Sequence, residues 1–298
     1  MKKHRIAAGN ITLILLTIFL TILVGCGGGG DGNNSTNSTI NGTAVKGPVA
    51  NATVTAFSIN DGAMGSQIGT GQTDAQGNFS VSVGDHSGPV MLQLKGGSYV
   101  DEATGTTMTM QQSDMMTSVI PSMSATASDV QMTPLTSMAQ VMAQEMSGGM
   151  TSANITIANT AVGIYFLVND ILHTRPMDPL AQGSGTGADQ NMKNYGMSIA
   201  AMSQYAKNLG MQFSSGMVTA MMNDASDGDM NGMMGSSHIT MGGGMMGGTG
   251  MMSSNAGTTE MANAMTQFTQ SSMNKSGVTL QDMLLLINKL MVSDGTIQ

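Results

Sequence analysis

The sequence has few aromatic residues, few charges and a single cysteine. Aromatic residues make up 3% of the 298 residues, with no Trp, and charged residues make up 9%. So few aromatic side chains leave little to line a sugar-binding or ligand-binding cleft. Ten Lys and Arg residues against 18 Asp and Glu residues argue against nucleic acid as a partner, because phosphate binding depends on clustered basic side chains. One cysteine excludes a disulfide within the chain.

Recognisable catalytic and cofactor motifs are also missing. No G-x-S-x-G, H-E-x-x-H, C-x-x-C, P-loop or G-x-G-x-x-G pattern occurs in a usable context. The segment from Gly183 to Gly187 lacks both the preceding strand and the third glycine of a dinucleotide site. Two close acids, or an acid beside His173, would be needed in a concave pocket for catalysis. We therefore expect that the protein is not an enzyme.

Residues 1–25 have the pattern of an export signal. Lys2, Lys3 and Arg5 precede an uncharged run from Ile11 to Val24, which matches a charged n-region followed by an apolar h-region. The run is shorter than the roughly 20 residues that a transmembrane helix needs. Removal of residues 1–25, which hold three basic residues and no acidic one, would take the formal net charge from −8 to −11.

The segment Leu23-Val24-Gly25-Cys26 at the end of this run resembles the lipobox of bacterial lipoproteins. The resemblance implies that Cys26 is diacylated and becomes the new N-terminus, which accounts for the lone cysteine. Two or three acyl chains are enough for stable anchoring. Residues 26–37 are polar and Gly-rich and predict a flexible tether. Gly27, rather than Asp, follows the cysteine, and by resemblance to enterobacterial sorting this favours the outer membrane, with either of its faces left open.

Residues 38–130 predict a small antiparallel β-sandwich. Short apolar and β-branched runs at residues 40–45, 52–58, 78–83 and 88–94 alternate with Gly, Asn and Asp. Alternation at a period of two residues, interrupted by turn residues, is typical of such a fold.

Three motifs in this region carry a resemblance to a known family. They are Gly42-x-x-Val45, Gly47-Pro48-Val49-x-x-Ala52-x-Val54 and Thr73-Asp74-x-x-Gly77-x-Phe79. Together they resemble the carboxypeptidase-regulatory-like, transthyretin-like β-sandwich family over about residues 38–95. The resemblance implies a non-catalytic spacer, adhesion or carbohydrate-contacting module. In the third motif we expect Asp74 to cap a turn, Gly77 to take a positive φ and Phe79 to point into the core.

Two acidic segments are candidates for Ca²⁺, which takes several oxygen ligands. Asp101 and Glu102 are adjacent in a predicted loop, and the alternative there is a solvated turn. The motif Asp227-x-Asp229-x-Asn231-Gly232 matches the first six positions of a calcium loop, but His238 stands at position twelve in place of Glu. The alternative for this second segment is a polar turn after a helix that ends near Ala225.

Residues 131–298 predict an α-helical domain, so the expected fold class is multidomain, β then α. Thr133 and Pro134 are typical of an N-cap and a first helical position, and Thr279 with Asp282 resembles a capping box. We expect five or six amphipathic helices to pack together. Their apolar stripes are Leu135, Met138, Met142 and Met146; Ile157, Ala161, Ile164, Val168 and Ile171; Met192, Tyr195, Ile199, Met202 and Leu209; Met261, Met265 and Phe268; and Leu280, Met283, Ile287 and Leu290.

Methionine is unusually frequent, at 34 residues against 17 Leu. In the helices we expect Met to replace Leu in the core, because its side chain adapts to irregular gaps. Residues 228–256 form a Met/Gly-rich loop that cannot supply a core stripe. Thioether sulfur binds Cu(I) and Ag(I), and imidazole can join it. The candidate ligands are Met230, Met233, Met234, His238, Met241, Met245, Met246, Met251 and Met252.

This loop resembles the Met-rich segments of periplasmic copper-handling proteins. An alternative is that its methionines act as an oxidant sink. The sequence as a whole predicts a membrane-anchored cell-envelope lipoprotein with a non-catalytic structural, adhesive or binding role. Its expected partners are the membrane, through the N-terminal lipid, and an envelope polysaccharide or protein. Soft-metal binding by the loop is the first alternative function, and a hydrolase accessory protein is the second.

Overall fold

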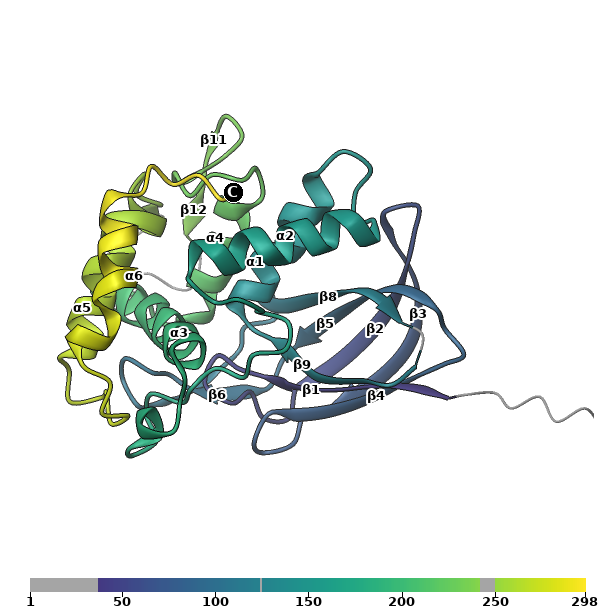
Figure 1. The fold of residues 1–298 in the computed structure, drawn as a ribbon, viewed down its shortest axis with the longest axis horizontal. Coiled ribbons are helices and arrows are strands. Elements are labelled where there is room, and N and C mark those ends of the chain that lie inside the picture. Colours follow the sequence, from purple (N-terminus) through teal and green to yellow (C-terminus); the bar gives the residue numbers. More distant parts are fainter. Residues whose placement is uncertain (1–36, 124, 242–249) are drawn as a thin grey trace, which may run out of the picture. The chain divides into compact units, whose positions relative to one another are not determined.

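A computed structural model describes residues 37–123, 125–241 and 250–298. The predicted signal peptide, the lipobox with Cys26 and the tether up to residue 36 lie outside the described residues, as do Met245 and Met246. Strands fill the N-terminal half of the described chain and helices fill the C-terminal half (Figure 1). The predicted order, β then α, is confirmed.

Seven strands build the two main sheets. A four-stranded antiparallel sheet has the order β3-β2-β5-β8, and a three-stranded sheet has the order β4-β1-β9. β6 and β7 form a separate hairpin. The bounds are β1 Ser38–Ala44, β2 Thr53–Asn60, β3 Ala63–Gln72, β4 Asn78–Gly84, β5 Gly88–Lys95, β6 Ser98–Val100, β7 Thr107–Thr109, β8 Met115–Met123 and β9 Ala127–Met132.

The four predicted runs coincide with β1, β2, β4 and β5. Residue alternation does not predict β3, because this strand is rich in Gly and polar residues and buries none of its side chains fully. It is recognised only by its pairing with β2 across the turn at Asp61 and Gly62.

One pairing departs from the expected antiparallel arrangement. β1 runs antiparallel to β4 but parallel to β9, with Gly42 opposite both Phe79 and Val130. The chain crosses from β8, in the four-stranded sheet, to β9, in the other sheet. β9 therefore reaches the free side of β1 through a crossover, whereas a tight hairpin would have produced an antiparallel pair. The prediction of a purely antiparallel arrangement is wrong at this edge.

The inward faces of the two sheets share one hydrophobic cluster. Ile40 and Val130 from the three-stranded sheet, and Val54 and Leu92 from the four-stranded sheet, are all fully buried within it. Strand β4 buries every second residue, as expected for a strand with one face on a core. Burial of apolar surface contributes about 25 cal/mol per Å², so this cluster is a main source of stability for the strands.

The turn before β4 forms as its sequence predicts. Asp74 Oδ1 accepts hydrogen bonds from the backbone N–H groups of Gln76, at 2.9 Å, and Asn78, at 2.8 Å. A further bond from the Asn78 side chain is the largest of the contacts that hold the pKa of Asp74 below its ordinary value. Gly77 has φ +79°, and Phe79 is 5% exposed. All three expectations for this motif are confirmed.

Six α-helices follow the strands in the described chain. They are α1 Pro134–Glu145, α2 Ser152–Tyr165, α3 Gln190–Asn208, α4 Ser215–Ala225, α5 Met261–Thr269 and α6 Leu280–Val292. Shorter elements between them are η1 Ser184–Thr186, β10 Met233–Met234, β11 Ser237–His238, β12 Thr240–Met241, β13 Gly250–Met251 and the π-helical turn η2 Ala256–Glu260. Thr133 caps α1, and Thr279 with Asp282 forms a capping box on α6, so both predicted helix starts are confirmed.

The predicted apolar stripe of α2 is wrong at two of its positions, whereas Ala161 is buried as expected. Ile157 and Ile164 are 51% and 55% exposed, whereas Ile155, Ala158 and Val162 are fully buried. Helix α2 ends at Tyr165, so Val168 and Ile171 do not extend its face. The face that packs against α1 and β8 decides which residues are buried, and tertiary packing of this kind overrides the local pattern.

The strands and helices meet in a second hydrophobic cluster. Ile59, Met91 and Val119 from the strands join Leu135 and Phe166 from the helical half in it. Helices α1 and α2 lie over β8 (Figure 1), and residues Ser35–Gln298 form one compact unit. The expected boundary near residue 130 therefore separates strands from helices, while the core continues across it. None of the helices in the described segments has the length and apolar sequence that crossing a bilayer demands.

Candidate functional site

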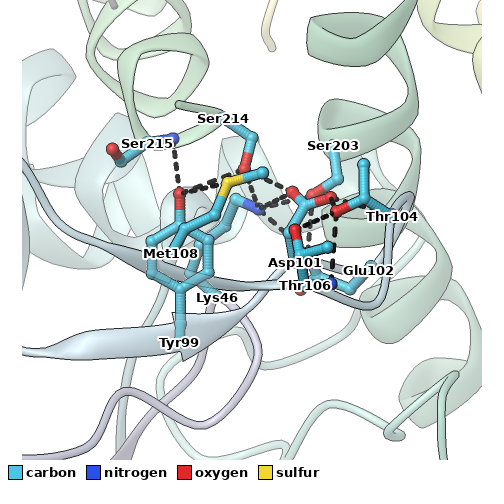
Figure 2. A network of polar contacts seen from close by, with 10 residues as sticks. All are labelled: Lys46, Tyr99, Asp101, Glu102, Thr104, Thr106, Met108, Ser203, Ser214 and Ser215. Atoms are coloured by element: carbon cyan, nitrogen blue, oxygen red, sulfur yellow. Dashed lines mark hydrogen bonds and ion pairs between the residues drawn. The ribbon is translucent and has the colours of Figure 1, made fainter. Parts of the chain in front are cut away.

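A buried polar cluster lies where the strands meet the helices (Figure 2). Lys46 comes from the turn after β1, and Asp101 and Glu102 follow β6. These three ionisable side chains are 0%, 1% and 2% exposed. The full set, here termed the Lys46 cluster, is Lys46, Tyr99, Asp101, Glu102, Ser203 and Ser214. Ser203 belongs to α3 and Ser214 precedes the first residue of α4, so the cluster joins segments that are far apart in the chain.

The Lys46 ammonium is the centre of this cluster. Its Nζ donates to Glu102 Oε2 at 2.9 Å, to Ser214 Oγ at 3.1 Å and to Ser203 Oγ. Asp101 Oδ2 lies 3.8 Å from the same nitrogen. The ammonium also lies 5.0 Å from the centroid of the Tyr99 ring, within the range of a cation–π contact. Each N–H group of the ammonium thus has a hydrogen-bond acceptor, and its positive charge lies close to two carboxylates.

The two carboxylates have further donors of their own. Ser203 Oγ donates to Glu102 Oε2 and Ser214 Oγ donates to Asp101 Oδ2, both at 2.5 Å. The backbone N–H and the hydroxyl of Thr104 donate to Asp101 Oδ1 at 2.9 and 2.8 Å. Buried carboxylates are tolerated when they are paired and hydrogen-bonded in this way.

The protonation state of Lys46 limits what the cluster can do. Burial by itself would lower the pKa of Lys46, but the negative charges of Glu102 and Asp101 outweigh burial and raise it. A lysine that stays protonated cannot take a proton from Ser203 or Ser214, as a general base must. The arrangement therefore favours a structural contact between strands and helices over activation of a serine nucleophile.

Asp101 and Glu102 do not form the solvated turn that is one expectation for them. Both are buried and face the Lys46 ammonium, so the carboxylates proposed for Ca²⁺ already hold a cationic side chain. No local signal identifies this pairing, because Lys46 is 56 residues from Glu102 and 168 residues from Ser214. Sequence reasoning missed Lys46, Ser203 and Ser214 for that reason.

The second calcium candidate forms a hydrogen-bonded turn after α4. Asp227 accepts from the backbone N–H groups of Asp229 and Gly235, and Asn231 Oδ1 accepts from Met233 N at 3.0 Å. Gly232 has the positive φ, +78°, that the motif requires. Within residues 37–123, 125–241 and 250–298, no group of three or more His, Cys, Asp or Glu side chains converges as a metal site would require. These contacts agree with the alternative of a polar turn.

A buried acid that the sequence analysis did not select lies under this turn. Asp224 is fully buried on α4, and its Oδ1 accepts from Gly232 N at 2.6 Å. Its Oδ2 has no hydrogen-bond partner among the described protein atoms. Burial, the largest cause, together with the nearby charge of Asp227, raises the pKa of Asp224 to about 7.

This raised pKa predicts a fall in stability as pH rises from about 4 to about 7. In that interval the unfolded chain releases the Asp224 proton while the folded chain retains it, so unfolding becomes easier by at most about 1.4 kcal/mol per pH unit. Asp224→Asn keeps an oxygen for Gly232 N and does not titrate. We expect urea unfolding of this variant to lose that part of the pH dependence. Asp61→Asn, in the exposed turn between β2 and β3, should keep the full pH dependence of the parent. If the stability of Asp224→Asn depended on pH as the parent's does, the raised pKa of Asp224 would be wrong.

The candidate soft-metal ligands of loop 228–256 divide between the interior and the surface. Met230, Met241 and Met252 are at most 4% exposed and belong to the hydrophobic cluster of the helices. Met234 and Met251 are 50% and 65% exposed, Met233 is half-buried and His238 is exposed. The loop therefore supplies core side chains, which its Gly-rich sequence does not predict, as well as surface thioethers.

His173 does lie beside an acid. Its Nδ1 is 2.9 Å from Asp170 Oδ2, and both side chains are about half exposed at the edge of a cavity of about 270 Å³. Asp170 Oδ1 also accepts from the backbone N–H groups of Leu172 and His173. Across the described segments, no serine or threonine hydroxyl is hydrogen-bonded to this imidazole. The contacts are those of a local turn.

Comparison with known proteins adds little to this description of the site. No family model matches the sequence, and no curated protein matches it either. Among solved structures, a 9R-lipoxygenase from Cyanothece PCC8801 aligns with 63% of this chain at 10% identity and a TM-score of 0.24. The chain spans 24% of the length of that lipoxygenase. A likeness this weak assigns neither a fold nor an activity.

Proposed function

We propose that the protein is a lipid-anchored lipoprotein of the cell envelope with a non-catalytic structural or binding role. The observation that best supports the non-catalytic role is the Lys46 cluster. Its lysine, two acids and two serines lie in the interior, and each is hydrogen-bonded to another member of the cluster. Groups arranged in this way fix the strands and helices in one arrangement, and a structural spacer or binding protein needs such rigidity.

The proposal includes a sandwich of the carboxypeptidase-regulatory-like kind for residues 38–130. The shared core of the β3-β2-β5-β8 and β4-β1-β9 sheets supports it. The Asp74 turn, Gly77 and Phe79, on which the resemblance depends, also have the conformations that such a module would give them. A module of this type would act by contact with an envelope polysaccharide or protein.

The anchor is tested by replacing Cys26. The full chain is expressed in a Gram-negative host fed with an alkyne-labelled palmitate, and the membrane and soluble fractions are compared. We expect the parent protein to carry the label in the membrane fraction and to lose residues 1–25, and Cys26→Ala to carry no label and to keep residues 1–25, because lipidation of the cysteine precedes cleavage. Gly25→Ala keeps a small residue before the cysteine and should behave as the parent. An unlabelled parent, or label on Cys26→Ala, would refute the proposed anchor.

Soft-metal binding by loop 228–256 is a second candidate, because strand pairing in this loop supports a smaller set of ligands. Met233 lies directly opposite His238 in the β10–β11 hairpin, and directly opposed side chains share one face of a hairpin. Met251 lies opposite Thr240 in the β12–β13 pair and is exposed. A site on this surface would use Met233, His238 and Met251, without the three core methionines.

A further inference from the structure

A methionine-lined cleft lies between the strands and helices α1 and α4. Its volume is about 660 Å³. Five of its fourteen lining residues are Met, against 34 of 298 in the whole chain, so the cleft is enriched about threefold. They are Met64 of β3, Met91 of β5, Met115 of β8, Met150 in the turn between α1 and α2, and Met222 of α4.

These methionines differ in their access to solvent. Met64 is 50% exposed and Met115 is half-buried, whereas Met91, Met150 and Met222 are 5%, 1% and 7% exposed. The buried three also pack in the hydrophobic clusters, which accounts for their apolar character. Core packing does not account for Met64 and Met115 at the surface, since an exposed thioether gains little from burial.

The rest of the lining is neutral. It contains the amide side chains of Gln93, Gln140, Gln144 and Asn223, and no Asp, Glu, His, Lys or Arg. Ca²⁺ and Mg²⁺ prefer charged oxygen ligands, so this lining does not suit them. Thioether sulfur is a soft ligand that suits Cu(I) and its analogue Ag(I).

Amide groups hold two of the sulfur atoms in place. Gln93 Nε2 donates to Met115 Sδ at 3.5 Å, and Gln140 Nε2 donates to Met150 Sδ at 3.6 Å. Gln140 is itself fixed, because its Oε1 accepts from the Thr117 hydroxyl at 3.0 Å. Each of these bonds uses one lone pair of its sulfur atom and leaves the second available to a cation.

An acidic groove adjoins the cleft. A neighbouring groove of about 840 Å³ shares Val141, Gln144 and Asn223 with it. Its lining adds three more methionines, Met142, Met146 and Met234, and the acids Glu145 and Asp227. Negative charge in a neighbouring groove concentrates cations near the cleft.

From these observations we infer that the cleft binds one soft monovalent cation, Cu(I) or Ag(I). We assign Met64, Met115 and Met222 as the ligands, one from each of three elements that line the cleft, and Met91 and Met150 complete its methionine lining. This site is separate from the surface set Met233, His238 and Met251, and it does not depend on the lipid anchor.

The test is an Ag(I) titration by calorimetry, repeated with Cu(I) without oxygen. Every protein is the full chain with Cys26→Ser, because a free thiol would bind both ions. We expect one tight equivalent in the parent, unaffected by excess Ca²⁺, and at least tenfold weaker binding in the Met64→Leu, Met115→Leu, Met222→Leu triple variant. Leu nearly conserves the volume of Met, so the expected loss of folding stability is below about 1.5 kcal/mol per site.

A matched variant separates the cleft from the loop. Met233→Leu, His238→Ala and Met251→Leu together should leave the tight equivalent intact. Equal binding by the parent and the cleft variant, or loss of the tight equivalent in the loop variant alone, would overturn the inference. If the cleft variant does not fold, ¹³C-methyl Met spectra of the parent replace it, with signals assigned from single Met→Leu variants. Ag(I) must then shift the Met64, Met115 and Met222 methyl signals, and unshifted signals refute the site.

Discussion

Lys46→Met should destabilise the protein by about 3–5 kcal/mol, the usual effect of removing one partner of a buried ion pair. The substitution keeps most of the side-chain volume but removes the ammonium from between Glu102 and Asp101. Both carboxylates would then stay in the interior without a counter-charge, and Ser203 and Ser214 would lose the donor that they share. Urea unfolding at pH 7, followed by circular dichroism, measures the loss.

Glu102→Gln is the matched control. The cluster holds one positive and two negative charges, so this substitution takes its formal charge from −1 to zero, whereas Lys46→Met takes it to −2. Gln still offers an oxygen to Lys46 Nζ and Ser203 Oγ. We expect it to change stability by only about 1 kcal/mol, the scale of one hydrogen bond. An equal loss in the two variants would show that shape, and not charge balance, holds the cluster together.

The parts of the fold that the sequence predicts are those with local causes. The Thr133 cap, the Thr279–Asp282 capping box and the Asp74 turn each depend on residues at most four positions apart. Strands β1, β2 and β4 follow from alternation with a period of two residues, because each has one face on the core. Strand β5 buries Val90, Met91 and Leu92 in succession, so its short apolar run predicts it. Such features need no knowledge of the rest of the molecule.

The Lys46 cluster could not be predicted, because its contacts join distant segments. A lone lysine after β1 and two adjacent acids 55 residues later look like surface residues in the sequence, and charged side chains are seldom fully buried without a partner. Ser203 and Ser214, which complete their burial, come from the helical half. The same is true of the cleft, whose methionines range from Met64 to Met222.

The predictions for methionine were partly misplaced for a related reason. A Gly-rich segment gives no periodic signal of burial, so Met230, Met241 and Met252 could not be recognised as core residues. Two-residue strand pairs fold this segment back on itself and carry these side chains into the cluster formed with the helices. In α2 the error is the reverse, since Ile157 and Ile164 of the predicted apolar stripe are exposed.

Gly42→Ala should cost about 3 kcal/mol, the upper part of the usual range for overpacking. Gly42 lies in the middle of β1, between Phe79 of β4 and Val130 of β9. A Cβ at this position would be 2.0 Å from the Val130 carbonyl oxygen and 2.6 Å from Phe79 Cζ. The carbonyl belongs to a paired strand and cannot rotate away without breaking the ladder, so β1 and β9 must separate. Thermal and urea unfolding measure the loss.

Gly187→Ala is the control for this substitution. Gly187 has φ −99° and has open space where a Cβ would lie. Alanine there should leave stability unchanged or raise it by about 0.4–1 kcal/mol, because it restricts the unfolded chain. If Gly42→Ala proved as harmless as Gly187→Ala, the close parallel approach of β1 and β9 at this position would be wrong. A clear loss at Gly42 alone would show that the glycine of the Gly42-x-x-Val45 motif is needed for that close approach, because no space is left for a side chain.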